Sequence, residues 1–169
     1  MYRTLAMVAL SLVSSAAMAA VSVGDKAPDF SLVDANGTTH QLSDFAGKTV
    51  VLEWTNHGCP FVKKHYGAEN MQGQQAKWTG DDVIWLSINS GAPGKQGHVD
   101  GAGAKAVMSE QGSKQTAYLL DANGEVGRSY GAKTTPHMYV IDGEGTLRYA
   151  GAIDSIPSAD QSDIAKATQ

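Results

Sequence analysis

The stretch Thr49–Tyr66, with the sequence TVVLEWTNHGCPFVKKHY, constrains the fold of this chain more than any other segment. It opens on an apolar run, Val50–Leu52, which is typical of a strand buried on both faces. A polar loop follows and leads into Cys59 and Pro60. Because proline fits best at the first helical position, where its missing N–H is not needed, a helix is predicted to begin at one of these two residues. The stretch is therefore predicted to form a buried strand, a short loop and then a helix.

Cys59 is the only cysteine in the sequence, and its position at the start of a helix predicts a reactive thiol. A thiol at the start of a helix lies close to unpaired backbone N–H groups and to the positive end of the helix dipole. Both favour the thiolate, which is the reactive form of cysteine. The alternative is a buried and inert thiol, which is the usual state of a free cysteine. We expect Cys59 to be redox-active.

Composition narrows the class of protein. The 169 residues suit one domain with a sizeable core, and the apolar and charged contents of 42% and 18% are ordinary for a soluble globular protein. The formal charge of −4 provides no basic surface, so no nucleic-acid partner is expected. Gly101–Ala106 reads GAGAKA, a weak match to a dinucleotide fingerprint, because it does not directly follow a strand. No cofactor is therefore expected.

Residues 1–19 have the pattern of a secretory signal peptide. Arg3 is the positive residue, Leu5–Val13 is a short apolar run, and Ala17–Ala19 is an Ala-x-Ala cleavage site. The apolar run is too short to span a bilayer, and an uncleaved N-terminal anchor is the alternative interpretation. We expect export, to the periplasm in a Gram-negative bacterium, and a mature domain over residues 20–169 that stays off the membrane. In an oxidising compartment an unpaired thiol is either linked to another molecule or reactive.

The rest of the chain alternates strand and helix patterns separated by glycine-rich turns. The last predicted helix has no C-cap signal, so we expect the chain to stop inside it. The predicted elements are strands Phe30–Val33 and Thr38–Leu42, a helical turn Leu42–Phe45, strand Thr49–Thr55, a helix from Pro60 interrupted at Gly67 and resuming over Met71–Trp78, strand Val83–Ile88, helix Ala104–Gln111, strand Tyr118–Leu120, a short helix Gly127–Tyr130, a hairpin of Met138–Asp142 with Thr146–Ala150, and a helix Ala159–Gln169.

Three segments together give the chain a family resemblance: VGDKAPDFSLVDANG, LSDFAGKTVVLEW and YGAKTTPHMYVIDGEGTLRYAG. Over residues 23–156 the chain resembles the thioredoxin-fold redoxins, which span the alkyl-hydroperoxide-reductase/thiol-specific-antioxidant family and the TlpA-like thiol oxidoreductases. The resemblance implies a thioredoxin-like α/β fold, in which helices flank a central mixed sheet and a β-hairpin precedes it.

The same resemblance assigns roles to individual residues. Cys59 matches the nucleophilic cysteine of the family, and Pro136, which follows Thr135, matches the cis-proline that packs beside it. Glu53 lies where thioredoxins keep a buried acid that moves protons. The alternatives are a core carboxylate paired with a lysine for Glu53 and an ordinary turn proline for Pro136.

The chain also departs from the family pattern. Val62 replaces the second cysteine of C-x-x-C, so the chain has no dithiol of its own. Leu52 and Asn56 replace the proline and the threonine or serine of the peroxiredoxin motif, and the Pro136 region replaces the peroxiredoxin arginine. Exported redoxins that share W-T-N-x-x-C-P-F-V-x-K-H-Y continue into a tail with a second cysteine. This implies a C-terminally truncated chain that lacks its resolving thiol.

Three basic side chains are candidate supports for the thiolate. His57 precedes Cys59 by two residues, His137 follows the proline, and Lys63 comes one helical turn after the cysteine. The alternatives are surface-loop histidines and a lysine on an exposed helix face. His57, Cys59 and His137 could also form a soft copper or zinc site, although no fourth ligand is evident. Lys64 and His65 are expected to be solvated.

Two classes of function follow. The first is an exported thiol-dependent oxidoreductase with a role in redox homeostasis or antioxidant defence. It performs either thiol–disulfide exchange or peroxide reduction, and its partners are a disulfide protein or a peroxide and a thiol reductant. The missing peroxiredoxin threonine and arginine favour exchange. The second is a non-enzymatic periplasmic protein of thioredoxin fold that binds a metal or an extended peptide.

Overall fold

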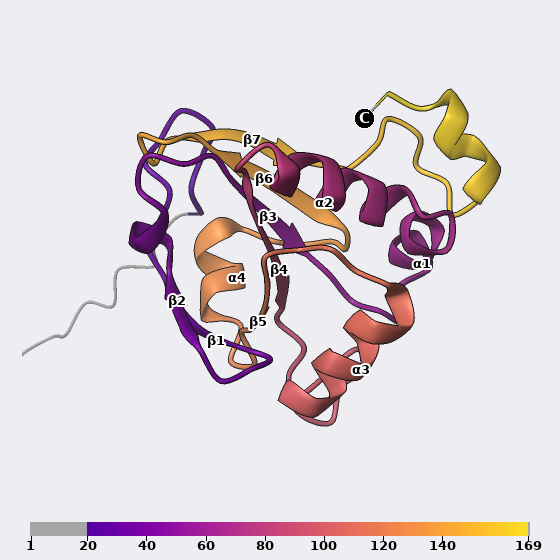
Figure 1. Cartoon of the computed structure of the whole chain (residues 1–169), viewed down its shortest axis with the longest axis horizontal. Coiled ribbons are helices and arrows are strands. Elements are labelled where there is room, and N and C mark those ends of the chain that lie inside the picture. The colour runs from indigo at the N-terminus through magenta and orange to yellow at the C-terminus, as the bar shows by residue number, and fades with distance from the viewer. Residues whose placement is uncertain (1–19, 169) are drawn as a thin grey trace, which may run out of the picture.

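The computed structural model describes residues 20–168, so the predicted signal segment lies outside the described residues. Seven strands form one mixed sheet in the order β2-β1-β5-β4-β3-β6-β7, and helices flank it (Figure 1). No helix in the described part is long and apolar enough to span a membrane. The elements are β1 (Ser31–Asp34), β2 (Thr39–Gln41), η1 (Leu42–Phe45), β3 (Val50–Trp54), α1 (Pro60–Gly67), α2 (Asn70–Gly80), β4 (Ile84–Asn89), α3 (Gly101–Gln111), β5 (Ala117–Leu120), α4 (Glu125–Tyr130), β6 (His137–Ile141), β7 (Leu147–Gly151) and η2 (Gln161–Lys166).

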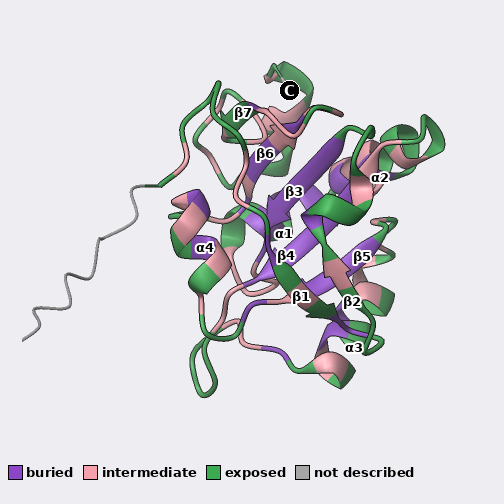
Figure 2. Cartoon of the chain, turned by 90° about the vertical axis from the view of Figure 1, so that its left-hand side faces the viewer, coloured by how far each residue is buried: buried purple, intermediate pink, exposed green. Residues whose placement is uncertain are grey.

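Strand β3 is an interior strand of the sheet, between β4 and β6, and all five of its residues are buried. It pairs in parallel with β4 and antiparallel with β6, which gives the mixed sheet that the sequence predicts. Figure 2 shows the central strands in the buried colour, whereas the hairpin strand β2 is largely exposed. The N-terminal hairpin is confirmed, because β1 and β2 pair antiparallel.

Successive side chains of β3 point to opposite faces of the sheet, and each face has its own core. Val50, Leu52 and Trp54 belong to a first core with residues of the N-terminal segment and Tyr130 of α4. Val51 lies on the other face, in a second core that is completed by α1 and α2. The members of the second core are Val51, Val62, Tyr66, Met71, Trp85 and Met138. Helix α1, which follows Cys59, is therefore held against the sheet through this second core.

The predicted break after α1 is confirmed. Helix α1 ends at Gly67, and Glu69 adopts a left-handed conformation with φ of 56° before α2 begins. The positive φ stops the first helix and turns the chain, so that α2 runs along the same face of the sheet. Gln72 of α2 fixes the corner by donating to the Tyr66 carbonyl oxygen at 2.9 Å.

The predicted C-terminal helix Ala159–Gln169 is wrong. Asp160 begins a 3-10 helix, η2, and accepts a hydrogen bond from the Ser162 N–H at 2.8 Å. Short polar side chains in this segment offer the backbone local partners that compete with an α-helix. Beyond η2, the Thr168 N–H donates to Ser155 Oγ at 3.0 Å and fixes the segment to the chain that leaves β7.

The prediction that Lys64 and His65 are solvated is also wrong. Both side chains are buried beneath the segment that follows β7. Asp154 of that segment accepts from Lys64 Nζ at 2.6 Å and lies 3.4 Å from His65 Nε2. Burial lowers the pKa of His65, and the neighbouring carboxylate opposes this effect. Polar residues such as Lys64 and His65 are typical of an exposed helix face. Here the segment around Asp154, which is distant in sequence, covers them.

Candidate active site around Cys59

Cys59 is the N-cap of α1, and Pro60 is the first helical residue, as predicted. The Cys59 backbone is extended, with φ of −71° and ψ of 130°, so the helical conformation begins at the next residue. The Cys59 N–H donates to the Asn56 carbonyl oxygen at 2.9 Å, which closes a tight turn before the helix. The thiol is half-buried and packs against the second core. It therefore combines partial access to solvent with a fixed backbone.

The loop between α4 and β6 forms one wall of the site. The Thr135–Pro136 peptide bond is cis, which confirms the prediction for Pro136, and the proline is buried. Cys59 Sγ donates to the Thr135 carbonyl oxygen at 3.0 Å. The contact joins residues 76 positions apart in sequence and places a main-chain acceptor directly on the thiol.

Val62, at the position of the second cysteine in C-x-x-C, is completely buried in the second core. Its aliphatic side chain packs in the same cluster against which Cys59 lies. The start of α1 thus presents a single thiol, and no second cysteine lies among the described residues to pair with it.

Glu53 lies on the same face of β3 as the second core and is completely buried. Its carboxylate accepts hydrogen bonds from Tyr66 Oη at 2.9 Å and Trp85 Nε1 at 2.9 Å. Ser87 Oγ and Gln75 Nε2 donate to it as well, at 3.0 Å and 3.1 Å. All four donors are neutral, so the partner is not the lysine of the alternative interpretation.

Burial raises the pKa of Glu53, although the four hydrogen bonds oppose this effect. Burial and the neighbouring Glu53 raise the pKa of Tyr66 well above its ordinary value, so the phenol stays protonated and donates. A carboxyl group with a raised pKa exchanges its proton at a higher pH than an exposed one. Glu53 is therefore a buried carboxyl group, next to the second core, that holds its proton at a higher pH than an exposed carboxyl group does.

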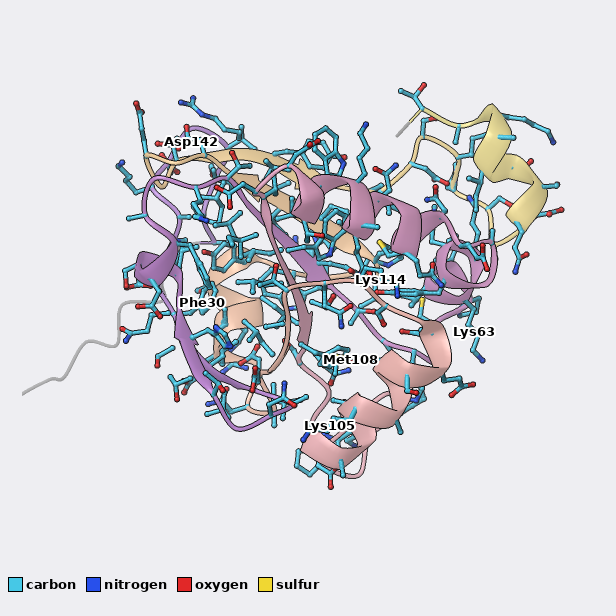
Figure 3. All side chains as sticks on the ribbon, in the orientation of Figure 1. Phe30, Lys63, Lys105, Met108, Lys114 and Asp142 are labelled. Atoms are coloured by element: carbon cyan, nitrogen blue, oxygen red, sulfur yellow. The ribbon has the colours of Figure 1, made fainter. Side chains whose placement is uncertain are left out.

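The structure does not bring the basic candidates together around the thiol. The His137 ring packs on Tyr139 at 4.6 Å between centroids, on the first-core face of the sheet. Burial, and then Lys133, lower the pKa of His137, which favours a neutral ring. Nδ1 of His57 is buried and has no hydrogen-bond partner among the described residues. Lys63 projects from the exposed side of α1 (Figure 3).

This arrangement does not support a metal centre at His57, Cys59 and His137. Within residues 20–168, no group of three or more histidine, cysteine, aspartate or glutamate side chains is placed to hold a metal ion. His137 is already engaged, because its Nδ1 lies 3.1 Å from Tyr139 Oη and accepts from the Lys133 N–H at 3.4 Å. The copper or zinc alternative therefore lacks a ligand set in the described part of the chain.

Sequence reasoning missed Gln96, which reaches the active-site loop from the connection between β4 and α3. Asn56 Nδ2 donates to Gln96 Oε1 at 2.9 Å, and Gln96 Nε2 donates back to Asn56 Oδ1 at 3.3 Å. The only available signal was the pair of glycines, Gly58 and Gly97, that flank the two amides in sequence. Glycines of this kind permit close approach of another segment.

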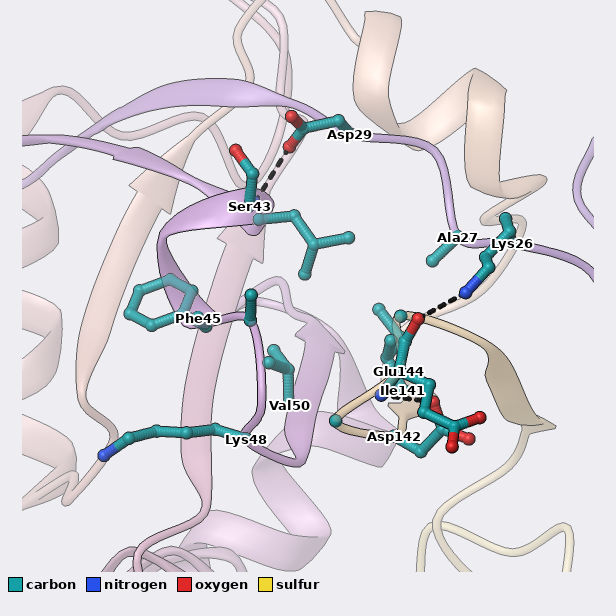
Figure 4. Close-up of a pocket in the computed structure, with 14 residues that line it drawn as sticks. Lys26, Ala27, Asp29, Ser43, Phe45, Lys48, Val50, Ile141, Asp142 and Glu144 are labelled. Atoms are coloured by element: carbon teal, nitrogen blue, oxygen red, sulfur yellow. Dashed lines mark hydrogen bonds between the residues drawn. The ribbon is translucent and has the colours of Figure 1, made fainter.

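Two cavities lie elsewhere on the molecule. A groove of about 820 Å³ runs between α2 and the segment after β7, over Val51, Met138 and Val140 of the sheet. A smaller cavity of about 230 Å³ lies between η1 and the β6–β7 turn, where Lys26 donates to the Glu144 carbonyl oxygen (Figure 4). Cys59 lines neither of them, and its side chain is half-buried beside the Thr135 carbonyl group.

Comparisons with known proteins agree with this architecture. The thiol-disulfide oxidoreductase ResA of Geobacillus kaustophilus is 32% identical over 127 residues, which cover 63% of this chain and 68% of the relative. The ResA protein of Geobacillus thermodenitrificans is 28% identical over 136 residues, covering 76% of this chain and 68% of that protein.

Solved structures place the fold. An uncharacterized conserved protein from Geobacillus kaustophilus matches with a TM-score of 0.73 at 28% identity, over 81% of this chain and 72% of that one. The exposed lipoprotein thioredoxin of Streptococcus pneumoniae matches with a TM-score of 0.59 at 27% identity, over 82% of this chain and 97% of that one. These likenesses confirm the thioredoxin-like fold, and the family model described as Redoxin matches residues 22–168. The chain belongs to the redoxin family.

Proposed function

We propose that this redoxin is an extracytoplasmic thiol-disulfide oxidoreductase that acts through Cys59 as its single nucleophile. The observation that carries the proposal is the position of the thiol at the start of α1, with Sγ 3.0 Å from the Thr135 carbonyl oxygen beside the cis-proline. The relatives named as thiol-disulfide oxidoreductases support the same reaction class.

The reaction consists of two exchange steps. The Cys59 thiol first loses its proton, and the thiolate then attacks one sulfur of a substrate disulfide. A new sulfur–sulfur bond forms to Cys59 while the substrate bond breaks, and the second substrate sulfur leaves as a thiolate. An external thiolate then attacks the mixed disulfide and releases Cys59. Cys59 is the one cysteine of the described residues, so the proposed reductant is a thiol outside this part of the chain.

Glu53 is the proposed proton acceptor of the first step. It lies on the face of the sheet that bears the second core, against which Cys59 packs. Its raised pKa allows it to take up a proton near neutral pH more readily than an exposed carboxylate. The hydroxyl groups of Tyr66 and Ser87, which contact the carboxylate, can reorient as it gains or loses the proton.

The surroundings of Cys59 favour exchange over peroxide reduction. Asn56 is at the position of the peroxiredoxin threonine, and its side-chain oxygen is occupied by the Gly58 N–H at 2.9 Å. The two arginines of the described part are engaged elsewhere, Arg128 with the Asn123 carbonyl oxygen and Arg148 with Asp142. A peroxide at Cys59 would therefore lack the arginine that polarises it in peroxiredoxins.

The extracytoplasmic location is supported by two observations. The sequence of residues 1–19 has the pattern of a signal peptide. A neighbour of known structure is described as an exposed lipoprotein thioredoxin. An oxidising compartment provides the disulfide substrates that this reaction consumes.

Mixed-disulfide formation tests the proposal. The reduced protein is mixed with dithiobis(nitrobenzoate), release of the coloured thiol is followed in time, and the adduct is located by mass spectrometry. We expect a single adduct on Cys59, its removal by added glutathione, and no reaction of Cys59→Ser. A thiol that reacts only after the protein is unfolded in urea would overturn the proposal, because it would be an inert core cysteine.

A further inference from the structure

The side-chain amides of Asn56 and Gln96 form a reciprocal pair across 40 positions of sequence. Each amide also lies against the backbone of the other segment. A Cβ atom on Gly58 would overlap the Gln96 amide, and a Cβ atom on Gly97 would overlap the Asn56 amide. Gly97 has φ of +83°, a conformation that suits glycine. We call this arrangement, made by Asn56, Gly58, Gln96 and Gly97, the amide clasp.

Hydrogen bonds within the connection between β4 and α3 fix the position of Gln96 next to Asn56. Buried Asn89, the last residue of β4, donates to the Gly97 carbonyl oxygen at 2.9 Å. His98 Nδ1 lies 2.7 Å from the Gly91 carbonyl oxygen, and the His98 N–H donates to the Lys95 carbonyl oxygen at 3.1 Å. These bonds close the loop on both sides of Gln96. Its side chain is thereby positioned although the residue itself is exposed.

The clasp places Gln96 at the entrance to Cys59. Gln96 lies on Gly58, the residue that directly precedes the cysteine, whereas Thr135 contacts the sulfur from the other loop. The two loops thus contact the Cys59 segment at adjacent points, one at Gly58 and the other at the sulfur. The β4–α3 loop and the cis-proline loop together frame the site.

The Gln96 amide retains hydrogen-bonding capacity for a substrate. A primary amide offers two N–H donors and an oxygen with two acceptor positions. The clasp uses one donor and one acceptor position of Gln96. One donor and one acceptor position remain, and they match the carbonyl and N–H of a peptide bond.

We propose that Gln96 is a specificity-determining residue, which hydrogen-bonds the main chain of a polypeptide disulfide as it reacts with Cys59. This inference rests on the proposed exchange function and adds the residue that recognises the main chain beside the substrate disulfide. In the step concerned, the Cys59 thiolate forms a bond to one substrate sulfur, and the other sulfur leaves with the electron pair of the broken bond. Gln96 contacts the peptide beside those sulfur atoms and takes no part in the electron transfer.

The first experiment compares two substrates in Gln96→Leu, which has a similar size but no hydrogen-bonding groups. Rates of Cys59 oxidation are measured with a disulfide-linked oligopeptide and with cystamine, which has no peptide bond. We expect the peptide rate to fall about tenfold, as expected for two neutral hydrogen bonds, and the cystamine rate to change less than about twofold. A parallel fall in both rates would overturn the proposal, because it would show that Gln96 only supports the loop.

The second experiment tests the proximity of Gln96 to the reacting sulfur atoms through charge. In Gln96→Glu, we expect the anionic disulfide dithiobis(nitrobenzoate) to react about threefold more slowly and cationic cystamine about threefold faster at low salt. Gln96→Lys should reverse both changes. Ala76→Glu, which adds the same charge on the exposed side of α2, is the matched control and should leave the ratio unchanged.

The wild-type measurement separates this inference from the proposed function. If Cys59 of the folded wild-type protein reacts with none of these disulfides, the proposed exchange function fails. If the wild type reacts and the ratios of the Gln96 variants match those of Ala76→Glu, exchange stands and the role of Gln96 is overturned.

Discussion

Lys64 Nζ lies 2.6 Å from Asp154 Oδ2, and the side chain of this lysine is completely buried. The ion pair joins the active-site helix α1 to the segment after β7, which is 90 positions away in sequence. Lys64 Nζ also lies 3.5 Å from the Ile156 carbonyl oxygen of the same segment. Since α1 begins at Cys59, the pair helps to fix the helix that carries the thiol.

Loss of one partner of this pair should destabilise the fold strongly. Asp154→Asn leaves the Lys64 ammonium group buried without a counter-charge, and breaking such a pair typically costs about 3–5 kcal/mol. Urea unfolding of the wild type and the variant measures the difference. The exposed pair Lys48–Asp82 is the control, and Asp82→Asn should cost less than about 1 kcal/mol. Equal costs for the two substitutions would contradict the structural role assigned to the buried pair.

Glu53 should make the fold less stable as pH rises. The unfolded carboxyl titrates near 4.5, whereas burial raises the pKa of Glu53 in the folded protein. Between these two values the native state holds the proton and the unfolded state does not. The free energy of unfolding therefore falls with increasing pH, by at most about 1.4 kcal/mol per pH unit. Glu53→Gln removes this contribution.

The comparison of wild type with Glu53→Gln isolates this effect. The lowered pKa values of His65 and His137 act in the opposite direction, because they remove stability as pH falls below 6.5. Both histidines are present in the two proteins, so their contributions cancel in the difference. Urea unfolding at a series of pH values measures the free energy of unfolding of both proteins. The value for the variant should rise relative to that of the wild type as pH increases above 4.5. Parallel pH profiles would show that Glu53 titrates as in the unfolded chain.

Glu53→Gln should also slow the reaction of Cys59 with disulfides. The substitution keeps the size of the side chain in its fully buried place but removes the proton acceptor. We expect a loss of about 10- to 100-fold in rate near neutral pH, smaller at alkaline pH where solvent removes the thiol proton. Stopped-flow kinetics with dithiobis(nitrobenzoate) measures it. A rate that is unchanged from about pH 6 to about pH 9 would assign Glu53 to structure alone.

Local patterns predicted the parts of this site that lie close together in sequence. The start of α1 at Cys59 and Pro60 follows from the helix preference of proline. The break at Gly67 was predicted for a similar reason, since glycine weakens a helix. The burial of Glu53 was implied by the family resemblance, which places a buried acid at this position.

The features that were missed depend on long-range partners. Lys64 looks like a surface residue until the chain returns after β7 and supplies Asp154. Gln96 is an unremarkable polar residue in a glycine-rich loop until the fold brings it to Asn56. Side-chain pairing between distant loops leaves no periodic signal in either segment, so sequence patterns could not reveal it.

Thr135→Ala should leave the reactivity of Cys59 nearly unchanged. The hydrogen bond from Cys59 Sγ uses the main-chain carbonyl oxygen of Thr135, which the substitution retains. We expect the rate with dithiobis(nitrobenzoate) to stay within about threefold of the wild type, less than the loss expected when a charge-stabilising donor is removed. A loss of about a hundredfold would mean that the Thr135 hydroxyl, and not the backbone, supports the thiol.

Hydrogen peroxide should oxidise Cys59 slowly. A dedicated peroxidase stabilises the developing charge on the peroxide with preorganised donors, and losing one such donor typically costs about 100- to 1,000-fold in rate. Asn56 is tied to Gly58 and Gln96, and both arginines of the described chain are engaged away from the thiol. With no second cysteine among the described residues, the sulfenic acid formed at Cys59 should persist or oxidise further until an added thiol reduces it. Stopped-flow oxidation followed by mass spectrometry of Cys59 measures the rate and the product. A rate that matches its reaction with polypeptide disulfides, or exceeds it, would make peroxide the better substrate and reverse the preference for exchange.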